Sequence, residues 1–182
     1  MFLKIFVSGF IWIPLLLSCS NDIQKVKALT RMDSLPDITV KQILVKQSEN
    51  GLITLELTAP QLNSYQGKDP YTEFPKGLKI IFYDSLMQPK SQLTANYGIS
   101  WDNRRMMEAR GNVILINYPK AATLNTEHLT WDENRKKMIS DQFVKITTPE
   151  KVVMGRSMES DELFDNWTIR QVSGTFYVNE EK

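Results

Sequence analysis

Few side chains in this sequence could carry out chemistry. The 182 residues contain one histidine, His128, and one cysteine, Cys19. One imidazole cannot build a His-rich metal site, and one cysteine forms neither an intramolecular disulfide nor a Cys-rich cluster. The sequence also lacks the G-x-S-x-G elbow of hydrolases and the G-x-x-x-x-G-K-[ST] loop of ATPases. We therefore predict that the protein is not an enzyme and has no catalytic residues, metal or cofactor.

The remaining polar clusters have ordinary interpretations. Alternation puts His128 on the face of Thr126 and Thr130, opposite Leu129, which predicts a histidine on the surface of a strand. An acidic run lacks the spacing of a calcium loop, so it favours a solvated loop over a calcium or sugar-cleaving site. This run comprises Glu159, Asp161, Glu162 and Asp165.

The charge balance excludes one class of partner. Lys and Arg total 22 against 21 for Asp and Glu, so the chain has no basic excess with which to neutralise phosphates. We therefore predict no binding to nucleic acid.

The first residues resemble a secretion signal. Lys4 gives a short positive start, and the stretch from Ile5 to Leu17 is almost entirely apolar. A helix of that length reaches about 20 Å, short of the roughly 30 Å hydrocarbon core of a bilayer. Leu16-Leu17-Ser18-Cys19 resembles the lipobox of bacterial lipoproteins, in which lipid is attached to the cysteine sulfur. We predict a signal peptide over 1–18, an acylated N-terminus and linker over 19–37, and a folded domain over 38–182. A signal anchor that is retained is the alternative.

Beyond the linker, apolar and polar residues alternate with a period of two. Asn50-Gly51 supplies the two positive φ values of a type I′ turn, and the following run from Ile53 to Ala59 alternates. Two more alternating stretches run from Leu78 to Tyr83 and from Leu93 to Ile99. No segment after residue 37 shows a helical period, so the sequence predicts an all-β sandwich, barrel or jelly roll.

Two hairpins repeat along the chain. Ile99 to Asp102 aligns with Leu129 to Asp132, and Met107 to Ala109 aligns with Met138 to Ser140. Each unit is an apolar strand, a polar turn containing Asp and Asn, and a second apolar strand. Stacked hairpins of this kind build an extended antiparallel sheet.

The repeated segments resemble the OstA-like domains of lipopolysaccharide export. The resemblance is carried by Gly111 to Leu115, Leu124 to Asp132, Ile139 to Ile146, and Gly155 with Met158 to Asp161, and it covers roughly residues 93–177. Together with the N-terminal anchor, the chain most resembles the LptC family of membrane-anchored periplasmic components. That family usually has a spanning helix as its anchor, so the lipobox departs from its pattern.

This resemblance implies an elongated, twisted, open β-jelly roll of antiparallel hairpins that forms a trough. Its apolar groove would bind the acyl chains of lipopolysaccharide, which it would receive from an inner-membrane ABC transporter and pass to a periplasmic LptA-like bridge protein. The protein would be lipid-anchored in the cell envelope, facing the periplasm, with the inner membrane favoured. The candidate groove lining is Leu55, Leu57, Ile80, Phe82, Ile99, Val113, Leu115, Leu129, Trp131, Val144 and Ile146.

The sequence leaves two alternatives for the apolar residues and two for the basic residues. The alternating pattern fits both an open groove and a filled core, so another envelope lipoprotein, either an amphiphile carrier or a structural adaptor with a filled β-sandwich, is the alternative. The basic residues in and beside the repeated turns serve solubility or contact lipid phosphates. They are Arg104, Arg105, Arg110, Arg135, Lys136 and Lys137.

Overall fold

The computed structural model describes residues 35–176. The predicted signal peptide and Cys19 lie outside this range, as does all but the end of the predicted linker. Over the described residues the chain forms eleven strands and no helix, so no helix there could cross a membrane. The strands are β1 (Ile38–Glu49), β2 (Leu52–Tyr65), β3 (Tyr71–Phe74), β4 (Leu78–Tyr83), β5 (Pro89–Ala95), β6 (Tyr97–Trp101), β7 (Met106–Asn117), β8 (Ala122–Asp132), β9 (Lys137–Thr147), β10 (Lys151–Asp161) and β11 (Trp167–Phe176).

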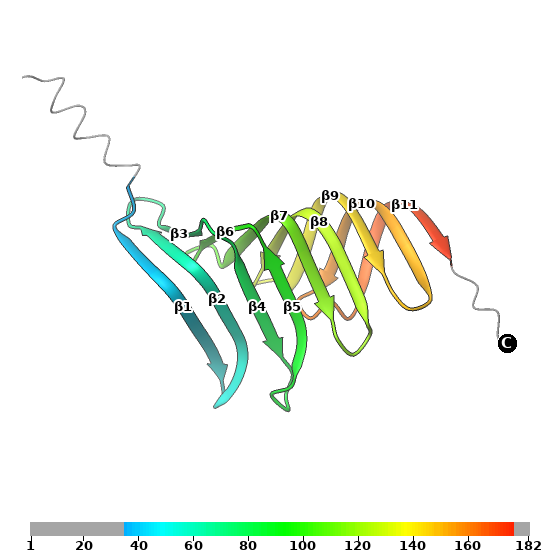
Figure 1. Cartoon of the computed structure of the whole chain (residues 1–182), viewed down its shortest axis with the longest axis horizontal. Coiled ribbons are helices and arrows are strands. Elements are labelled where there is room, and N and C mark those ends of the chain that lie inside the picture. Colours follow the sequence, from blue (N-terminus) through cyan, green and yellow to red (C-terminus); the bar gives the residue numbers. More distant parts are fainter. Residues whose placement is uncertain (1–34, 177–182) are drawn as a thin grey trace, which may run out of the picture. The chain divides into compact units, whose positions relative to one another are not determined.

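All strands belong to one antiparallel sheet, which confirms the predicted all-β fold of antiparallel hairpins (Figure 1). From β7 to β11 each strand pairs with the next in the chain. Between β2 and β7 the sheet divides into two branches, one through β4 and β5 and the other through β3 and β6. Each half of β2 and of β7 therefore pairs with a different branch.

The division continues along the sheet as two layers. Layer A contains β4 and β5 with residues 52–59, 113–117, 122–126, 144–147 and 151–155 of the longer strands. Layer B contains β3 and β6 with residues 61–65, 106–110, 128–132, 137–140, 156–161 and 167–170. The rings of Phe82 in layer A and Trp131 in layer B meet edge to face at 5.2 Å between centroids, so the layers face each other. Figure 1 shows one layer in front of the other.

The long strands pass from one layer to the other along a single line, which we call the spine. Most of them bulge there. The register of β7 with β8 shifts between Arg110 and Val113, where Gly111 and Asn112 have φ of 72° and 47°. Ser157 in β10 and Gln171 in β11 have φ of 63° and 49° at matching places. A bulge bends its strand, so a row of bulges folds the sheet along one line.

The predicted turn chemistry is confirmed for the first hairpin. Glu49 pairs with Leu52, which leaves the two-residue loop Asn50-Gly51 with φ of 51° and 81°. Both values are positive, as a type I′ turn requires. This turn fixes β1 on β2 along their whole length.

The predicted repeat is present as two equivalent hairpins in layer B, β6–β7 and β8–β9. Their turns place Arg105 and Lys136 at the same position, each with φ of 51°. The residues that follow, Met107 and Met138, are both buried. The sequence match therefore reflects matching backbone geometry.

The sequence placed two side chains, those of Ile99 and Thr126, on the wrong face of the sheet, because strict alternation ignores corners and bulges. The run from Leu93 to Ile99 is broken at Asn96, and Ile99 pairs with Glu73 and Glu108 on the outer face. The β8–β9 register shifts between Thr126 and Thr130, so Thr126 is buried on the inner face while Thr130 faces outward. Each irregularity moves the following side chains to the opposite face.

Candidate functional site

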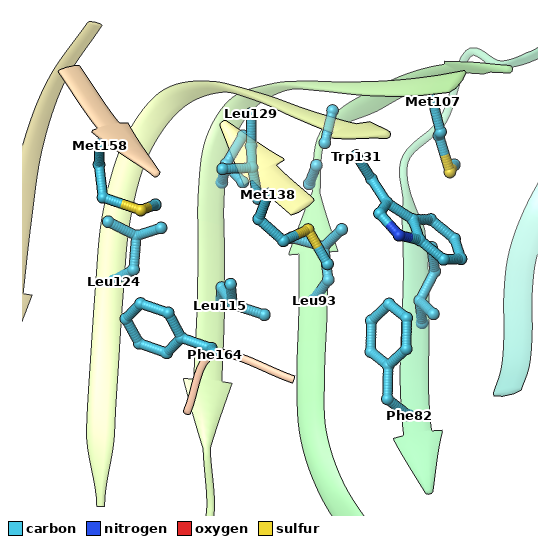
Figure 2. Close-up of a cluster of buried hydrophobic side chains, with 14 of the residues drawn as sticks. Phe82, Leu93, Met107, Leu115, Leu124, Leu129, Trp131, Met138, Met158 and Phe164 are labelled. Carbon is cyan, nitrogen blue, oxygen red and sulfur yellow. The ribbon is translucent and has the colours of Figure 1, made fainter. Parts of the chain in front are cut away.

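The apolar faces of the two layers meet in one continuous cluster, which we call the interior. Layer A contributes aliphatic side chains and one ring, and layer B contributes methionines, Leu129 and an indole (Figure 2). The principal members are Ile80, Phe82, Leu93, Val113, Leu115, Leu124, Val144 and Ile146 from layer A, and Met107, Leu129, Trp131, Met138, Met158 and Ile169 from layer B.

Methionine is unusually frequent on one wall. Met107, Met138 and Met158 are buried and project from three neighbouring hairpins of layer B toward layer A (Figure 2). The unbranched thioether adopts many shapes at low energetic cost, so methionine fits itself to irregular or changing neighbours. One wall of the interior is thus built from side chains that can repack.

The structure brings together most of the predicted groove residues. Nine are buried in the interior, and Leu57 is half-buried against it. Ile99 lies on the outer face and is not part of it. That these side chains contact lipid stays a prediction. The nine are Leu55, Ile80, Phe82, Val113, Leu115, Leu129, Trp131, Val144 and Ile146.

Sequence reasoning missed several interior residues. Met107 and Met138 carried a signal, since both are matched positions of the repeat. Met158 lies beyond a bulge that alternation cannot detect. Phe164 was hidden within the acidic run, yet it is completely buried. An apolar pair, Leu163-Phe164, inside an otherwise acidic turn was the available clue.

The interior also contains polar groups. Asn117 is fully buried, and its amide donates to the carbonyl oxygens of Leu163 and Phe164 at 3.0 and 3.2 Å. The hydroxyl of Ser91 and the indole N–H of Trp131 are buried with no hydrogen-bond partner among the described residues. An unpaired buried donor carries a desolvation cost that an acceptor entering the interior would relieve.

The β1 end of the interior is incompletely covered. Val40 and Val45 pair with Leu62 and Leu57, which are only half-buried, and Val40 and Val45 are themselves exposed. At the β11 end, by contrast, two side chains from neighbouring strands contact each other: the ammonium of Lys151 lies 5.6 Å from the ring centre of Trp167. Inner-face apolar side chains are therefore open to solvent at the β1 end.

Both terminal strands of the sheet present a free edge within the described residues. β1 pairs only with β2, and β11 pairs only with β10. β1 is exposed along most of its length, including Ile38, Val40, Leu44 and Val45. An exposed apolar edge strand offers unpaired N–H and C=O groups to another chain.

Opposite the spine, the two rows of turns form a mouth between the layers. A recess of about 230 Å³ opens there, with Leu55, Phe82 and Trp131 among its lining. Charged residues share this lining, including Glu49 at the end of β1 and Arg105 from the β6–β7 turn. Buried interior residues therefore line a recess at the mouth.

The outer face carries a charged cluster around His128. Its Nδ1 lies 3.2 Å from Asp141 Oδ1 and its Nε2 lies 3.4 Å from Glu108 Oε2. Burial opposes ionisation of Glu108, but hydrogen bonds from Arg110 and His128 outweigh it and lower the Glu108 pKa. The hydrogen bond from His128 lowers the pKa of Asp141. His128 faces outward as predicted, and it links β7, β8 and β9.

Most of the basic turn residues already have acidic partners. Arg105 lies 3.5 Å from Glu133, and Lys137 lies 3.1 Å from Glu159. Arg104 pairs with Asp69 and Arg110 with Glu108. These pairs favour turn solubility over a phosphate site.

Comparison with known proteins identifies one family. The family model described as "Lipopolysaccharide-assembly, LptC-related" matches residues 5–170, which is most of the 182-residue chain. A search of curated proteins found no match.

Proposed function

Because the chain belongs to the lipopolysaccharide-assembly, LptC-related family, we propose that its interior binds the acyl chains of lipopolysaccharide and passes them on. Membership of this family gives the protein a part in lipopolysaccharide transport, with other components of that system, at the cell envelope. It is a family of transport components, not of enzymes.

The observation that carries the proposal is an apolar interior between two layers that continuous strands join only along the spine. An apolar chain placed there would lie between Leu, Ile and Val on one side and methionines on the other. Exposing a twelve-carbon acyl chain to water costs on the order of 10 kcal/mol, at about 0.8 kcal/mol per methylene. A continuous apolar path removes that cost during transfer.

In this structure the side chains of the two layers fill the interior, so acyl chains enter only when the layers separate. Met107, Met138 and Met158 repack readily, and the bulged spine bends. The unpaired N–H of Trp131 and hydroxyl of Ser91 would gain partners from the ester or amide carbonyls of an acylated lipid. Bound lipid thus replaces contacts that the layers make with each other.

The free edges support contacts with neighbouring components through strand addition. β1 follows the predicted membrane anchor in the chain, so we assign its edge to the inner-membrane ABC transporter components. β11 lies at the other end of the strand order, and we assign it to a periplasmic LptA-like bridge protein. Strand addition supplies backbone hydrogen bonds that depend little on side chains.

The anchor completes the proposed placement. Acylation at Cys19 would hold the domain at a membrane surface, facing the periplasm, with residues 19–37 as a tether. Several acyl chains bury enough methylenes to make such attachment effectively permanent. Attachment at the inner membrane would keep β1 close to the transporter.

A pair of charge substitutions in neighbouring residues tests the proposal. Leu57→Glu places a carboxylate on the half-buried inner face, whereas Thr58→Glu places one beside Lys79 on the outer face. We expect Leu57→Glu to cause lipopolysaccharide to accumulate at the inner membrane, and Thr58→Glu to leave export unchanged. Circular dichroism and urea unfolding establish that both variants fold.

A structural adaptor is the second candidate, favoured by the complete burial of interior residues such as Ile80 and Leu124. An adaptor needs its core only for stability. A folded, correctly localised Leu57→Glu variant that exports lipopolysaccharide normally would favour the adaptor and contradict the proposal.

A further inference from the structure

One turn of layer B reaches across the mouth to layer A. Residues 162–166 connect β10 to β11, and we call them the clasp turn. Asn117, at the end of β7 in layer A, donates from Nδ2 to the Leu163 and Phe164 carbonyls and to Asp165 Oδ1, the last at 3.0 Å. The two hydrogens of one buried amide nitrogen are therefore within hydrogen-bond distance of three acceptors of the clasp turn, so one hydrogen is shared between two of them.

Two lysines of layer A fasten the same turn. Lys90 Nζ lies 2.6 Å from Asp165 Oδ2, and the Lys120 ammonium donates to the Asp165 backbone carbonyl. The Lys90 and Asp165 side chains are 23% and 24% exposed, so water reaches this pair from the mouth. The clasp turn is therefore held to layer A in part by an ion pair that solvent can reach.

The turn also places an aromatic ring in the interior. Phe164 is completely buried and lies beside Leu115 and Leu124 (Figure 2). The positive-φ residues of the other two layer B turns are Arg105 and Lys136, whose side chains are 59% and 72% exposed. All three residues have positive φ, 51° for Arg105 and Lys136 and 56° for Phe164. Of these three positive-φ residues, only Phe164 has its side chain buried in the interior.

A bulky residue in the left-handed region carries backbone strain. Arg105 and Lys136 share that strain without entering the interior, whereas Phe164 offsets it by burying its ring. Asp161 keeps the turn rigid, because its carboxylate accepts from the backbone N–H groups of Asp165 and Asn166 at 2.7 and 3.0 Å. The clasp turn is therefore held in one conformation by its own hydrogen bonds.

We propose that the clasp turn holds the mouth between layers A and B closed, and that it must release before an acyl chain enters the interior. Release breaks the Lys90–Asp165 pair and the Asn117 hydrogen bonds, and it withdraws Phe164 from beside Leu115 and Leu124. The neighbouring recess, which Leu55 and Trp131 line, is where separation of the layers begins. This inference rests on the proposed binding of acyl chains in the interior.

A reversible covalent lock tests the clasp. The full-length Lys90→Cys/Asp165→Cys variant is bridged with a short bis-methanethiosulfonate linker, and binding of fluorescently labelled lipopolysaccharide is measured before and after reduction. We expect bridging to lower binding by about tenfold or more, because only the open fraction binds. Reduction should restore it.

A bridge within one layer is the matched control. Lys46 and Glu56 are paired across β1 and β2 with 3.1 Å between their charged atoms. Bridging the Lys46→Cys/Glu56→Cys variant should leave binding unchanged. Cys19 is the one native cysteine, so the single variants Lys90→Cys and Asp165→Cys reveal any linkage to it. Equal lipopolysaccharide binding by the bridged and reduced clasp variant would overturn the inference.

A measurement without lipid separates this inference from the proposed function. In the Asp165→Asn variant, amide hydrogen exchange over residues 113–120 and 161–166 should accelerate about tenfold, with residues 52–59 unaffected. If the reduced and control proteins bind no lipopolysaccharide, the proposed function fails and the exchange result alone judges the clasp. Unchanged exchange in Asp165→Asn would show that the turn does not hold the mouth.

Discussion

Asn117 is the most heavily engaged polar side chain of the interior. Its Nδ2, with two hydrogens, lies within hydrogen-bond distance of three acceptors, and its Oδ1 accepts from the Lys120 backbone N–H at 2.9 Å. Nothing else among the described residues joins β7, the β7–β8 turn and the clasp turn at one atom group. The Asn117 amide thus joins layer A to layer B at the mouth, as the bulged strands join them at the spine.

Replacing this amide should be costly. We expect Asn117→Ala to lower the free energy of unfolding by about 2–3 kcal/mol, because buried acceptors lose their donor. Asn125→Ala, on the exposed face of β8, is the control and should change it by about 0.5 kcal/mol or less. Urea unfolding of both variants measures the difference. Equal effects would show that the Asn117 hydrogen bonds contribute little.

Asp165 gives the clasp a defined pH dependence. Burial opposes its ionisation, but hydrogen bonds from Lys90 and Asn117 outweigh burial and lower its pKa below the ordinary value of 3.8. Because folding lowers this pKa, the ionised carboxylate stabilises the folded protein at pH values above 3.8. That contribution disappears as the pH falls through the folded-state pKa.

Comparison with an uncharged variant isolates this contribution. At pH 7 we expect Asp165→Asn to be about 1 kcal/mol less stable than the unmodified protein. The difference should shrink as the pH is lowered below 3.8, where Asp165 itself becomes neutral. Urea unfolding at several pH values measures it. A difference that is constant or grows toward acid would contradict the assignment of the charge to the clasp.

At the scale of elements, close approach of strands at the spine depends on glycine. A Cβ on Gly155 of β10 would lie 2.4 Å from Ile169 Cγ2 and 3.0 Å from the backbone oxygens of Arg170 and Gln171. Backbone atoms cannot move aside as a side chain can. The β10–β11 pairing next to the Gln171 bulge therefore requires a residue without a side chain.

We expect Gly155→Ala to lower the free energy of unfolding by about 1–3 kcal/mol through overpacking. Gly67 in the β2–β3 loop has no neighbour within 4 Å of an added Cβ. Gly67→Ala should therefore change stability by about 0.5 kcal/mol or less. Thermal or urea unfolding distinguishes the two. A Gly155→Ala variant as stable as Gly67→Ala would mean that β10 and β11 separate easily.

The elements themselves were largely predictable from the sequence. Alternation and the Asn50-Gly51 turn located the first hairpin, and the matched Met107 and Met138 identified the repeated one. The bulges were less visible, because Ser157 and Gln171 adopt positive φ without a glycine or asparagine to signal it. The predicted faces of Ile99 and Thr126, which lie at a corner and at a bulge, were therefore wrong.

The candidate site was predictable to the same degree. Residues of the interior share an alternating pattern that burial imposes, so most of the predicted lining is indeed buried. The clasp turn was not predictable, because its contacts join Asn117 to residues more than 40 positions later. Asp165, expected in a solvated loop, is instead half-buried and paired with Lys90. Its partner is a product of the folded topology.

At the scale of the whole molecule, one continuous sheet combines a methionine-rich interior with two edge strands, β1 and β11, that each pair on one side only. The layers are joined along the spine by bulged strands and at the mouth by the clasp turn. Edge strands at both ends of the strand order allow neighbouring components to extend the sheet. Under the proposed function, lipid passing through such an assembly would stay between two apolar walls, and ATP-hydrolysing partners would supply the direction.

Photo-cross-linking in cells tests the central claim most directly. A light-activated residue is placed at Leu129, buried in the interior, or at Thr130, its neighbour on the outer face, and adducts with lipopolysaccharide are detected by blotting. Adjacent residues of a strand face opposite sides, so each position controls for the other. We expect adducts at Leu129 and none at Thr130. No adduct at either position, from folded and correctly localised protein, would contradict lipid binding in the interior and favour the filled adaptor.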